Sequence, residues 1–474
     1  MSIYQGRCHS HQSFQIILAP VLQDSGLPFA DVLLEDEICQ AFADAGAEFG
    51  RGENGVYTPA ITLWAFLSQV LYKGEQRSCE AAVARVIALL TTLGRKPCSD
   101  DSGAYCRARA KLPEEVLQKL TLQVGQRLEH QAPADWRWHG RRVMLVDGTT
   151  VSAPDTVKNQ EMYPQPNTQK EGLGFPVIRL VMLLSLATAA VCGMALGPYA
   201  GKETGESALF RQLLDQLQRG DIVVADRYFA SYFMAALLLA IGVDFTFRQH
   251  QLRTTDFRRG RRLGKGDHVV VWMRPDRPDW MDKDTYDRMP ETLTVRELDV
   301  QVSQPGFRTE SLVVVTSFTD AQAHTKDEIA DLYHARWHVE LDLRSIKQSL
   351  GMDVLRCKTP AMLRKEIWTH LLAYNLLRKM NAQSALLSQK RLPREISLTA
   401  AMQKAAASWS VLPAATAESF HRLALTHLKH LAGHRVGNRP NRVEPRAVKR
   451  RPSPIALLME PRADARAKLL NAGD

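Results

Sequence analysis

The sequence predicts an α/β protein with an all-helical region before the sheet and a β-rich insertion within it. Two short apolar runs, 142–147 and 221–226, each end on an aspartate and are typical of buried strands. Helical periodicity dominates before residue 130 and again after residue 325. A chain of 474 residues is long enough for two or three domains.

The first predicted region, residues 1–130, is helical. Its first 54 residues contain two arginines against eight acidic residues, so a surface for an anionic partner is expected after residue 54. Thr58 and Pro59 begin one helical stretch, and 78–94 forms a second that ends at a glycine. With 99–113, these helices fit either a helix-turn-helix-like DNA reader or a simple bundle packed on the next domain. Three cations favour DNA contact: Arg107, Arg109 and Lys111.

Residues 138–249 are expected to form the first part of an α/β core. Its first strand ends at Asp147, and the Gly-Thr-Thr that follows predicts a loop. The apolar stretch 177–196 predicts two consecutive buried strands, because three polar residues interrupt what would otherwise resemble a membrane span. The later elements are a helix over 206–218, a strand to Asp226, a helix over 231–241 and a strand over 243–248.

A separate β-rich subdomain is expected over residues 250–310. From Asp226 to Glu340 there are 340 − 226 = 114 positions, more than a minimal strand–helix core needs. Short β runs occupy this stretch, and a cluster of cations surrounds Gly260 and Gly264 near its start. The cluster fits a flexible basic hairpin that follows a phosphate backbone, with a merely solvated charged loop as the alternative.

The second part of the core, 311–380, begins with a strand over 311–318 and continues into one long helix. Thr325 and Glu328 form a capping box at the start of this helix, and Gly351 supplies its end. One face carries an apolar stripe: Ile329, Leu332, Val339, Leu343, Ile346 and Leu350. Residues 381–474 predict a helical C-terminal region with a basic, proline-rich tail over 435–451.

A second stripe on this helix is polar and holds one carboxylate among cations and a phenol: Tyr333, Arg336, Glu340, Arg344 and Lys347. Arginine and lysine are suited to phosphate oxygens. Asp147 and Asp226 end buried strands, where α/β sheets place ligands. An aspartate at a strand end is more often a turn or cap residue, but two of them together with Glu340 on a cationic face are hard to explain as caps. The pattern predicts a metal-dependent site that acts on a nucleic-acid backbone.

These residues resemble the DDE transposases of bacterial insertion sequences, of the insertion-sequence-four type with a Y-R-E-K signature. The likeness is carried by VDGTT at Asp147, QKEGLGFPVIRL at 169–180, ADRYFAS at Asp226 and YHARWHVELDLRSIK at 333–347. It covers about residues 142–359 and implies an RNase H-like catalytic core with a β-rich insertion. It also implies that Asp147, Asp226 and Glu340 bind two Mg²⁺ ions, with Mn²⁺ as a substitute.

The resemblance further implies that Tyr333, Arg336 and Lys347 contact DNA phosphates near the cut. An aromatic residue in the insertion is expected to hold a flipped base, for which Trp272 is the first candidate and Trp280 the second. A buried structural tryptophan is the alternative for both. The remaining predicted DNA contacts are Arg344, Arg227, Arg258, Arg259, Arg261 and Arg262.

The function expected from this resemblance is cut-and-paste transposition of an insertion sequence. The partners would be double-stranded DNA, at terminal inverted repeats and at a target, and a second copy of the chain in a synaptic homodimer. The formal net charge of +10 is compatible with DNA. Neither a P-loop nor a G-x-G-x-x-G fingerprint occurs, so no nucleotide cofactor is expected.

Seven scattered cysteines without a C-x2-C pair, together with a start unlike a signal peptide, predict a cytoplasmic, nucleoid-associated protein with no membrane partner. Two alternative functions remain. One is an RNase H-like nuclease without strand transfer, and the other is a decayed or domesticated transposase that only binds DNA.

Overall fold

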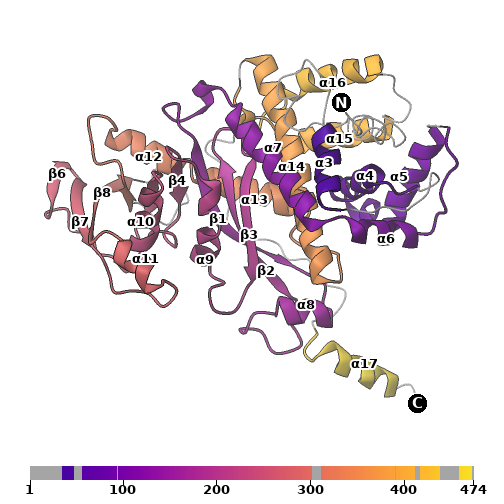
Figure 1. Ribbon diagram of the computed structural model, residues 1–474, viewed down its shortest axis with the longest axis horizontal. Coiled ribbons are helices and arrows are strands. Elements are labelled where there is room, and N and C mark those ends of the chain that lie inside the picture. Colours follow the sequence, from indigo (N-terminus) through magenta and orange to yellow (C-terminus); the bar gives the residue numbers. More distant parts are fainter. Residues whose placement is uncertain are drawn as a thin grey trace.

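One sheet of nine strands organises the computed structural model, in the order β3-β2-β1-β4-β5-β9-β8-β7-β6. The structure describes residues 35–46, 56–92, 94–301, 311–389, 391–411, 417–437 and 458–471. Figure 1 shows the strands of the insertion at one end of the molecule and a helical region at the other. Residues 1–34, the segment 302–310 and most of the predicted basic tail lie outside the described residues.

The strands follow the chain in an order that keeps the first five together. Their bounds are β1 Val143–Ser152, β2 Val177–Ser185, β3 Val191–Pro198, β4 Ile222–Ala225, β5 Asp244–Arg248, β6 Arg261–Gly264, β7 Asp267–Met273, β8 Thr292–Gln301 and β9 Ser311–Thr316. β1, β4 and β5 run parallel, while β2 and β3 form an antiparallel edge next to β1. β9 is antiparallel to both β5 and β8, so the insertion extends the same sheet.

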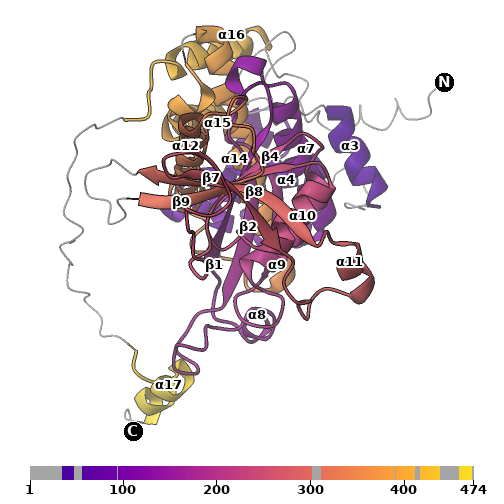
Figure 2. The ribbon, with the colours of Figure 1, turned by 90° about the vertical axis from the view of Figure 1, so that its left-hand side faces the viewer.

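Helices cover the sheet and form the helical end of the molecule. Those before β1 are α3 Glu35–Asp44, α4 Pro59–Leu71, α5 Cys79–Thr92, α6 Gly103–Lys111 and α7 Glu114–His130. Those between strands are α8 Val157–Met162, α9 Glu206–Arg211, α10 Tyr232–Ala240 and α11 Lys283–Arg288. Those after β9 are α12 Lys326–His334, α13 Trp337–Arg344, α14 Pro360–Ser388, α15 Leu398–Val411, α16 Ala417–Leu431 and α17 Arg462–Asn471. Figure 2 shows α8 and α17 at the end of the molecule opposite α15 and α16.

The sheet separates two hydrophobic cores. Side chains alternate across a strand, so Val143 and Leu145 of β1 pack with α7, α13 and α14 on one face. Met144 and Val146 pack with α9 and α10 on the other. Both faces are buried along Val143–Val146, which explains why the first part of β1 is continuously apolar rather than alternating.

Most predicted elements are confirmed, with small shifts at their ends. Thr58 caps α4 through its side chain, and Ser231 caps α10 in the same way. The apolar stretch 177–196 forms β2 and β3 as predicted. In the described part of the chain, no helix is both long enough and apolar enough to cross a membrane.

Two predictions about the core need correction. β1 does not end at Asp147, because Gly148 to Ser152 continue the strand and pair with β2 as far as Val177. The Gly-Thr-Thr sequence is therefore strand rather than loop: its antiparallel partner satisfies the backbone there. The predicted helix over 206–218 is also shorter, and only Glu206–Arg211 is α-helical before a short 3₁₀ turn.

The long helix α14 joins the helical region to the sheet. Its Asn375 donates from Nδ2 to the carbonyl oxygens of Thr121 on α7 and Val191 on β3, both at 2.9 Å. Its Oδ1 accepts from the Val191 N–H at 2.8 Å. Gly125 of α7 lies directly against the same strand, where an added Cβ would be 1.9 Å from the Val191 carbonyl oxygen. The close approach of α7 to β3 thus requires glycine at this position.

We expect Gly125→Ala to destabilise the protein by about 1–3 kcal/mol, because backbone rather than a flexible side chain must move to admit the methyl group. Gly205→Ala is the matched control: φ there is −68° and no heavy atom lies within 4 Å of the added Cβ. The urea unfolding midpoint of each variant measures the difference. Equal midpoints for the two variants would contradict the contact between α7 and β3.

Candidate active site

Two aspartates lie side by side on neighbouring parallel strands. Val146 of β1 is opposite Ala225 of β4. The residues that follow them directly in the sequence are Asp147 and Asp226. Asp226 follows the last residue of β4, as the sequence predicts, whereas Asp147 lies within β1. The sheet therefore brings together the first two predicted acids.

The two carboxylates lack a balancing cation at bonding distance. Asp147 Oδ1 accepts from the Gly148 N–H at 2.8 Å, and Asp226 Oδ1 accepts from the Tyr228 N–H at 2.9 Å. Neither forms an ion pair with a described residue. Burial raises the pKa of Asp147 to about 7; Arg336 and the Gly148 amide oppose this rise, and the negative charge of Asp226 adds to it.

A third acid, Glu206, joins this pair and was not among the predicted site residues. It is the first residue of α9, and its carboxylate lies so close to Gly148 that an added Cβ there would be 2.2 Å from Oε1. Burial and then the charge of Asp226 raise the pKa of Glu206. An acid in the first turn of a helix is common because it complements the helix dipole, so no sequence pattern distinguishes Glu206 from an ordinary first-turn acid.

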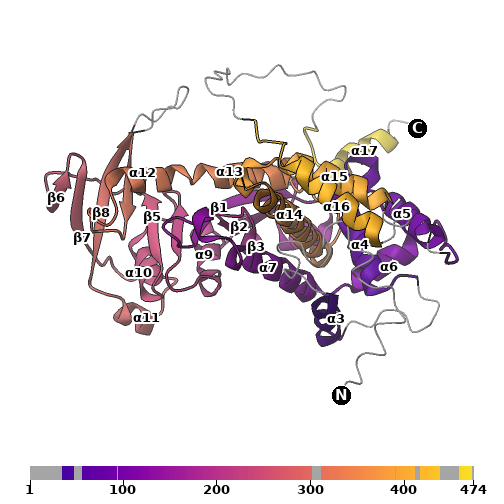
Figure 3. The same cartoon turned by 90° about the horizontal axis from the view of Figure 1, so that it is seen from above.

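The predicted single long helix is two helices. The capping box of Thr325 and Glu328 starts α12 as expected, and the apolar stripe is buried. The α-helix then breaks after His334, and a tight turn in which the Arg336 N–H donates to the Tyr333 carbonyl at 3.0 Å precedes α13. After Arg344 the chain widens into a π-helix over Ser345–Ser349, a feature often found at functional sites. Figure 3 shows α12 and α13 following one another beside the sheet.

Arg336 stands between the third predicted acid and the aspartates. Its Nη2 donates to Glu340 Oε1 at 2.8 Å, and its charge also acts on Asp147. The Glu340 side chain is 47% exposed. Among the described residues, no group of three or more His, Cys, Asp or Glu side chains is arranged to hold a metal ion. The structure thus pairs Glu340 with Arg336 rather than with Asp147 and Asp226.

The other predicted contacts on this segment differ in exposure. Tyr333 is 3% exposed, and burial raises its pKa to about 12. Its phenol packs beneath Arg336, whose guanidinium lies 6.0 Å from the ring, and its contact with DNA stays a prediction. Lys347 is half-buried within the π-helix, and Arg344 is exposed. Arg227, after β4, is half-buried and lies 5.3 Å from the ring of Tyr228.

The insertion presents its cations to solvent but hides its predicted aromatic contact. The exposed arginines are Arg258, Arg259, Arg261 and Arg262. Trp272 is 3% exposed, its Nε1 donates to Glu297 Oε1 at 3.0 Å, and Arg253 covers the ring at 3.9 Å. Both the ring face and the donor of Trp272 are therefore occupied within the protein, as in the buried structural alternative, and its contact with a flipped base stays a prediction. Trp280 is half-buried against Phe233, with Arg211 over its ring.

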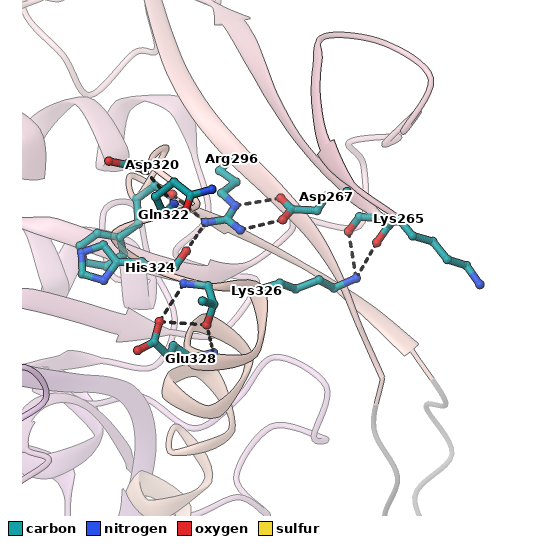
Figure 4. A network of polar contacts seen from close by, with 12 residues as sticks. Lys265, Asp267, Arg296, Asp320, Gln322, His324, Lys326 and Glu328 are labelled. Carbon is teal, nitrogen blue, oxygen red and sulfur yellow. Dashed lines mark hydrogen bonds and ion pairs between the residues drawn. The ribbon is translucent and has the colours of Figure 1, made fainter.

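A buried polar network attaches the insertion to the start of α12 (Figure 4). Arg296 of β8, fully buried, donates to both carboxylate oxygens of Asp267 on β7 at 2.8 and 2.6 Å. Its Nη1 reaches forward to the His324 carbonyl at 2.6 Å. Lys326 donates back from α12 to the Lys265 carbonyl at 2.9 Å. These hydrogen bonds therefore fix the position of the insertion relative to the start of α12.

A second buried carboxylate fixes α13. Asp342 is 2% exposed and accepts from Arg378 of α14 at 2.8 Å and from Arg394 at 2.6 Å. Glu340 lies only two residues earlier, on the opposite side of the helix, so the same double ion pair determines where Glu340 points.

A mixed α/β sheet with two acids on adjoining parallel strands, and a helix carrying a third acid packed against the first strand, is an arrangement suited to chemistry on phosphate esters. The family model described as "Transposase DDE domain" matches residues 138–376, about half of the chain. The chain belongs to this family.

The chain is also similar to individual transposases over part of its length. The chain is 28% identical over 280 residues to transposase InsG for insertion sequence element IS4 of Escherichia coli K12, which covers 58% of this chain and 60% of InsG. It is 30% identical over 95 residues to the putative transposase InsZ of the same organism, covering 20% of this chain and 31% of InsZ. The chain thus spans about three fifths of InsG and about a third of InsZ. A cryo-EM structure of a piggyBac transposase synaptic complex with hairpin DNA aligns with 92% of this chain and 88% of its own, at 11% identity and a TM-score of 0.43.

We expect Asp342→Ala to cost about 3–5 kcal/mol, because it leaves Arg378 and Arg394 buried without their carboxylate. Glu418→Ala is the control: its pair with Arg422 is similarly short at 2.9 Å, but both side chains are at least 75% exposed, so the expected cost is below about 1 kcal/mol. Urea denaturation followed by tryptophan fluorescence compares them. A similar midpoint for both variants would exclude the proposed anchoring of α13.

Proposed function

We propose that this chain is a DNA transposase that excises an insertion sequence by cutting DNA phosphodiester bonds and joins the released 3′-hydroxyl ends to target DNA. The observation that supports it most directly is the pairing of Asp147 on β1 with Asp226 just after β4, with α13 packed against β1 and Arg336 close enough to lower the pKa of Asp147. Membership of the DDE family supports the same chemistry.

The donor set fits divalent cations in part. Asp226 lies close enough to Asp147 for its negative charge to raise the pKa of Asp147, and neither carboxylate is paired with a described cation. Their carboxylate oxygens are the ligands that Mg²⁺ prefers. Glu340 would complete the set once its carboxylate leaves Arg336. Two Mg²⁺ ions, or Mn²⁺ in their place, would supply an activated oxygen nucleophile and stabilise the leaving oxygen.

The cations of the polar stripe would hold the DNA backbone. Arg336 carries a planar guanidinium that can exchange Glu340 for a phosphate at similar hydrogen-bond geometry. Lys347 and the exposed Arg344 extend this surface along the π-helix and α13. Water would serve as the nucleophile for the first cut, and the transposon 3′-hydroxyl for joining to the target.

The remaining parts of the proposal concern architecture and partners. The order β3-β2-β1-β4-β5 with β1, β4 and β5 parallel supports an RNase H-like core. The helices α4 to α6 would contact transposon ends, and the exposed arginines of β6 and the loop before it would follow the DNA backbone. Two copies would join two inverted repeats in a synaptic homodimer, in the bacterial cytoplasm at the nucleoid.

We expect Glu340→Gln to reduce DNA cleavage by more than about 100-fold while DNA binding is kept, since one ligand oxygen loses its charge and the shape is unchanged. The substrate is a DNA fragment with the flanking sequence of the gene, incubated with Mg²⁺, and breaks are mapped at nucleotide resolution. Asp331→Asn is the matched control, because its side chain is 87% exposed on the preceding helix α12.

The positions of the breaks decide among the functions. Glu340-dependent breaks at a pair of inverted repeats, followed by joining to a second DNA, support a transposase. Scattered breaks without joining would instead make the protein a nuclease. Binding without any break would make it a decayed element, and equal cleavage by Glu340→Gln would refute the assignment of Glu340.

A further inference from the structure

A cavity of about 430 Å³ lies between the helices α4, α5 and α6 and the segment that leads into α14. Four cationic side chains line it: Arg77, Arg109, Arg356 and Lys358. We call it the cationic cavity. It shares no residue with the acidic site on β1 and β4, and it joins parts of the chain about 250 or more residues apart.

The described lining of the cavity carries four cations and two carboxylates, so its positive charge is only partly balanced. None of the four cations forms an ion pair with a described residue. The two carboxylates at the cavity are already occupied: Glu366 accepts from the N–H groups of Arg356 and Cys357 at 2.9–3.1 Å, and Glu80 accepts from the Ser102 hydroxyl at 3.3 Å. The cavity therefore holds more positive charge than its own acids balance.

Two of the arginines are fixed in place before any ligand arrives. Arg77 donates to the Gly351 carbonyl at 2.9 Å and lies 3.0 Å from His370 Nε2. Arg109 donates to Gln69 at 2.9 Å and lies over the ring of Phe66, yet its Nε is buried without a hydrogen-bond partner. A buried guanidinium N–H without an acceptor is costly, which is a sign that an acceptor is missing.

We propose that the cationic cavity is a phosphate-binding site separate from the catalytic carboxylates. Pre-positioned arginines match the tetrahedral oxygens of a phosphate, and the exposed Arg356 and Lys358 provide the entrance. The phosphate belongs either to a DNA strand or to a free anion. A DNA strand is within structural reach, because Val354 pairs with Ser152 at the end of β1, the strand that carries Asp147.

Cysteine reactivity measures occupancy of the cavity without requiring catalysis. Cys79 and Cys106 line the cavity and are half-buried, whereas Cys98 is similarly half-buried but outside the lining and serves as an internal reference. The protein is labelled with N-ethylmaleimide in the presence of either pyrophosphate or a short DNA duplex of arbitrary sequence, at constant ionic strength. Mass spectrometry measures the labelling rate of each cysteine. Labelling of Cys79 and Cys106 should slow about tenfold when the probe exceeds its Kd tenfold, with Cys98 unchanged.

The matched variants remove two positive charges in different places. Arg356→Gln/Lys358→Gln acts at the cavity entrance, where both side chains are exposed and the fold is not at risk. Arg422→Gln/Lys429→Gln removes the same charge from the exposed surface of α16. Protection should be lost in the first variant and kept in the second.

The outcomes separate this site from the proposed catalysis. Protection by both probes assigns the phosphate to DNA, and protection by pyrophosphate alone assigns it to a free anion. No protection by either probe, or equal protection in the entrance variant, refutes the phosphate site. The duplex result rests on the proposed DNA function, so the experiment is repeated with Glu340→Gln, in which protection should persist even though cleavage is lost.

Discussion

The buried carboxylate of Asp342 is the interaction on which the arrangement of the acidic site depends. Placing one acid between Arg378 and Arg394 is favourable only because both of its oxygens are satisfied by charged donors in a fixed geometry. That geometry sets the rotation of α13 against α14. Since Glu340 is on the other side of the same short helix, the direction of its side chain follows from an ion-paired residue only two positions away.

The carboxylates of the acidic site, unlike that of Asp342, are not neutralised by ion pairs. Asp342 is neutralised completely, whereas Asp147 and Asp226 are held close together with only hydrogen bonds from the backbone and the more distant charge of Arg336. Such an arrangement stores repulsion that a bound cation relieves. The side of α13 that carries Asp342 is thus stabilised by two ion pairs, whereas Asp147 and Asp226 have no described cation at bonding distance.

The sequence predicted the elements well because strand and helix periodicity report burial along one segment at a time. The paired aspartates, β2 and β3, and the capped start of α12 followed from local pattern alone. Glu206, the break before α13 and the covering of Trp272 did not, because each is decided by contacts between segments distant in sequence. Glu206 looks like an ordinary first-turn acid until the fold places it against Gly148. Tyr333 and Arg336 were likewise predicted to share one helical face. The tight turn between them leaves Tyr333 buried and Arg336 partly exposed.

The continuity of the sheet has a mechanical consequence. Because β9 pairs with both β5 and β8, the insertion is not a body on a flexible tether but a stiff extension of the core. The Arg296 network clamps this extension to the root of α12. A displacement of the arginine-bearing end of the insertion would therefore be transmitted to the start of α12 rather than absorbed by a hinge, and the twist of the sheet sets the angle between them.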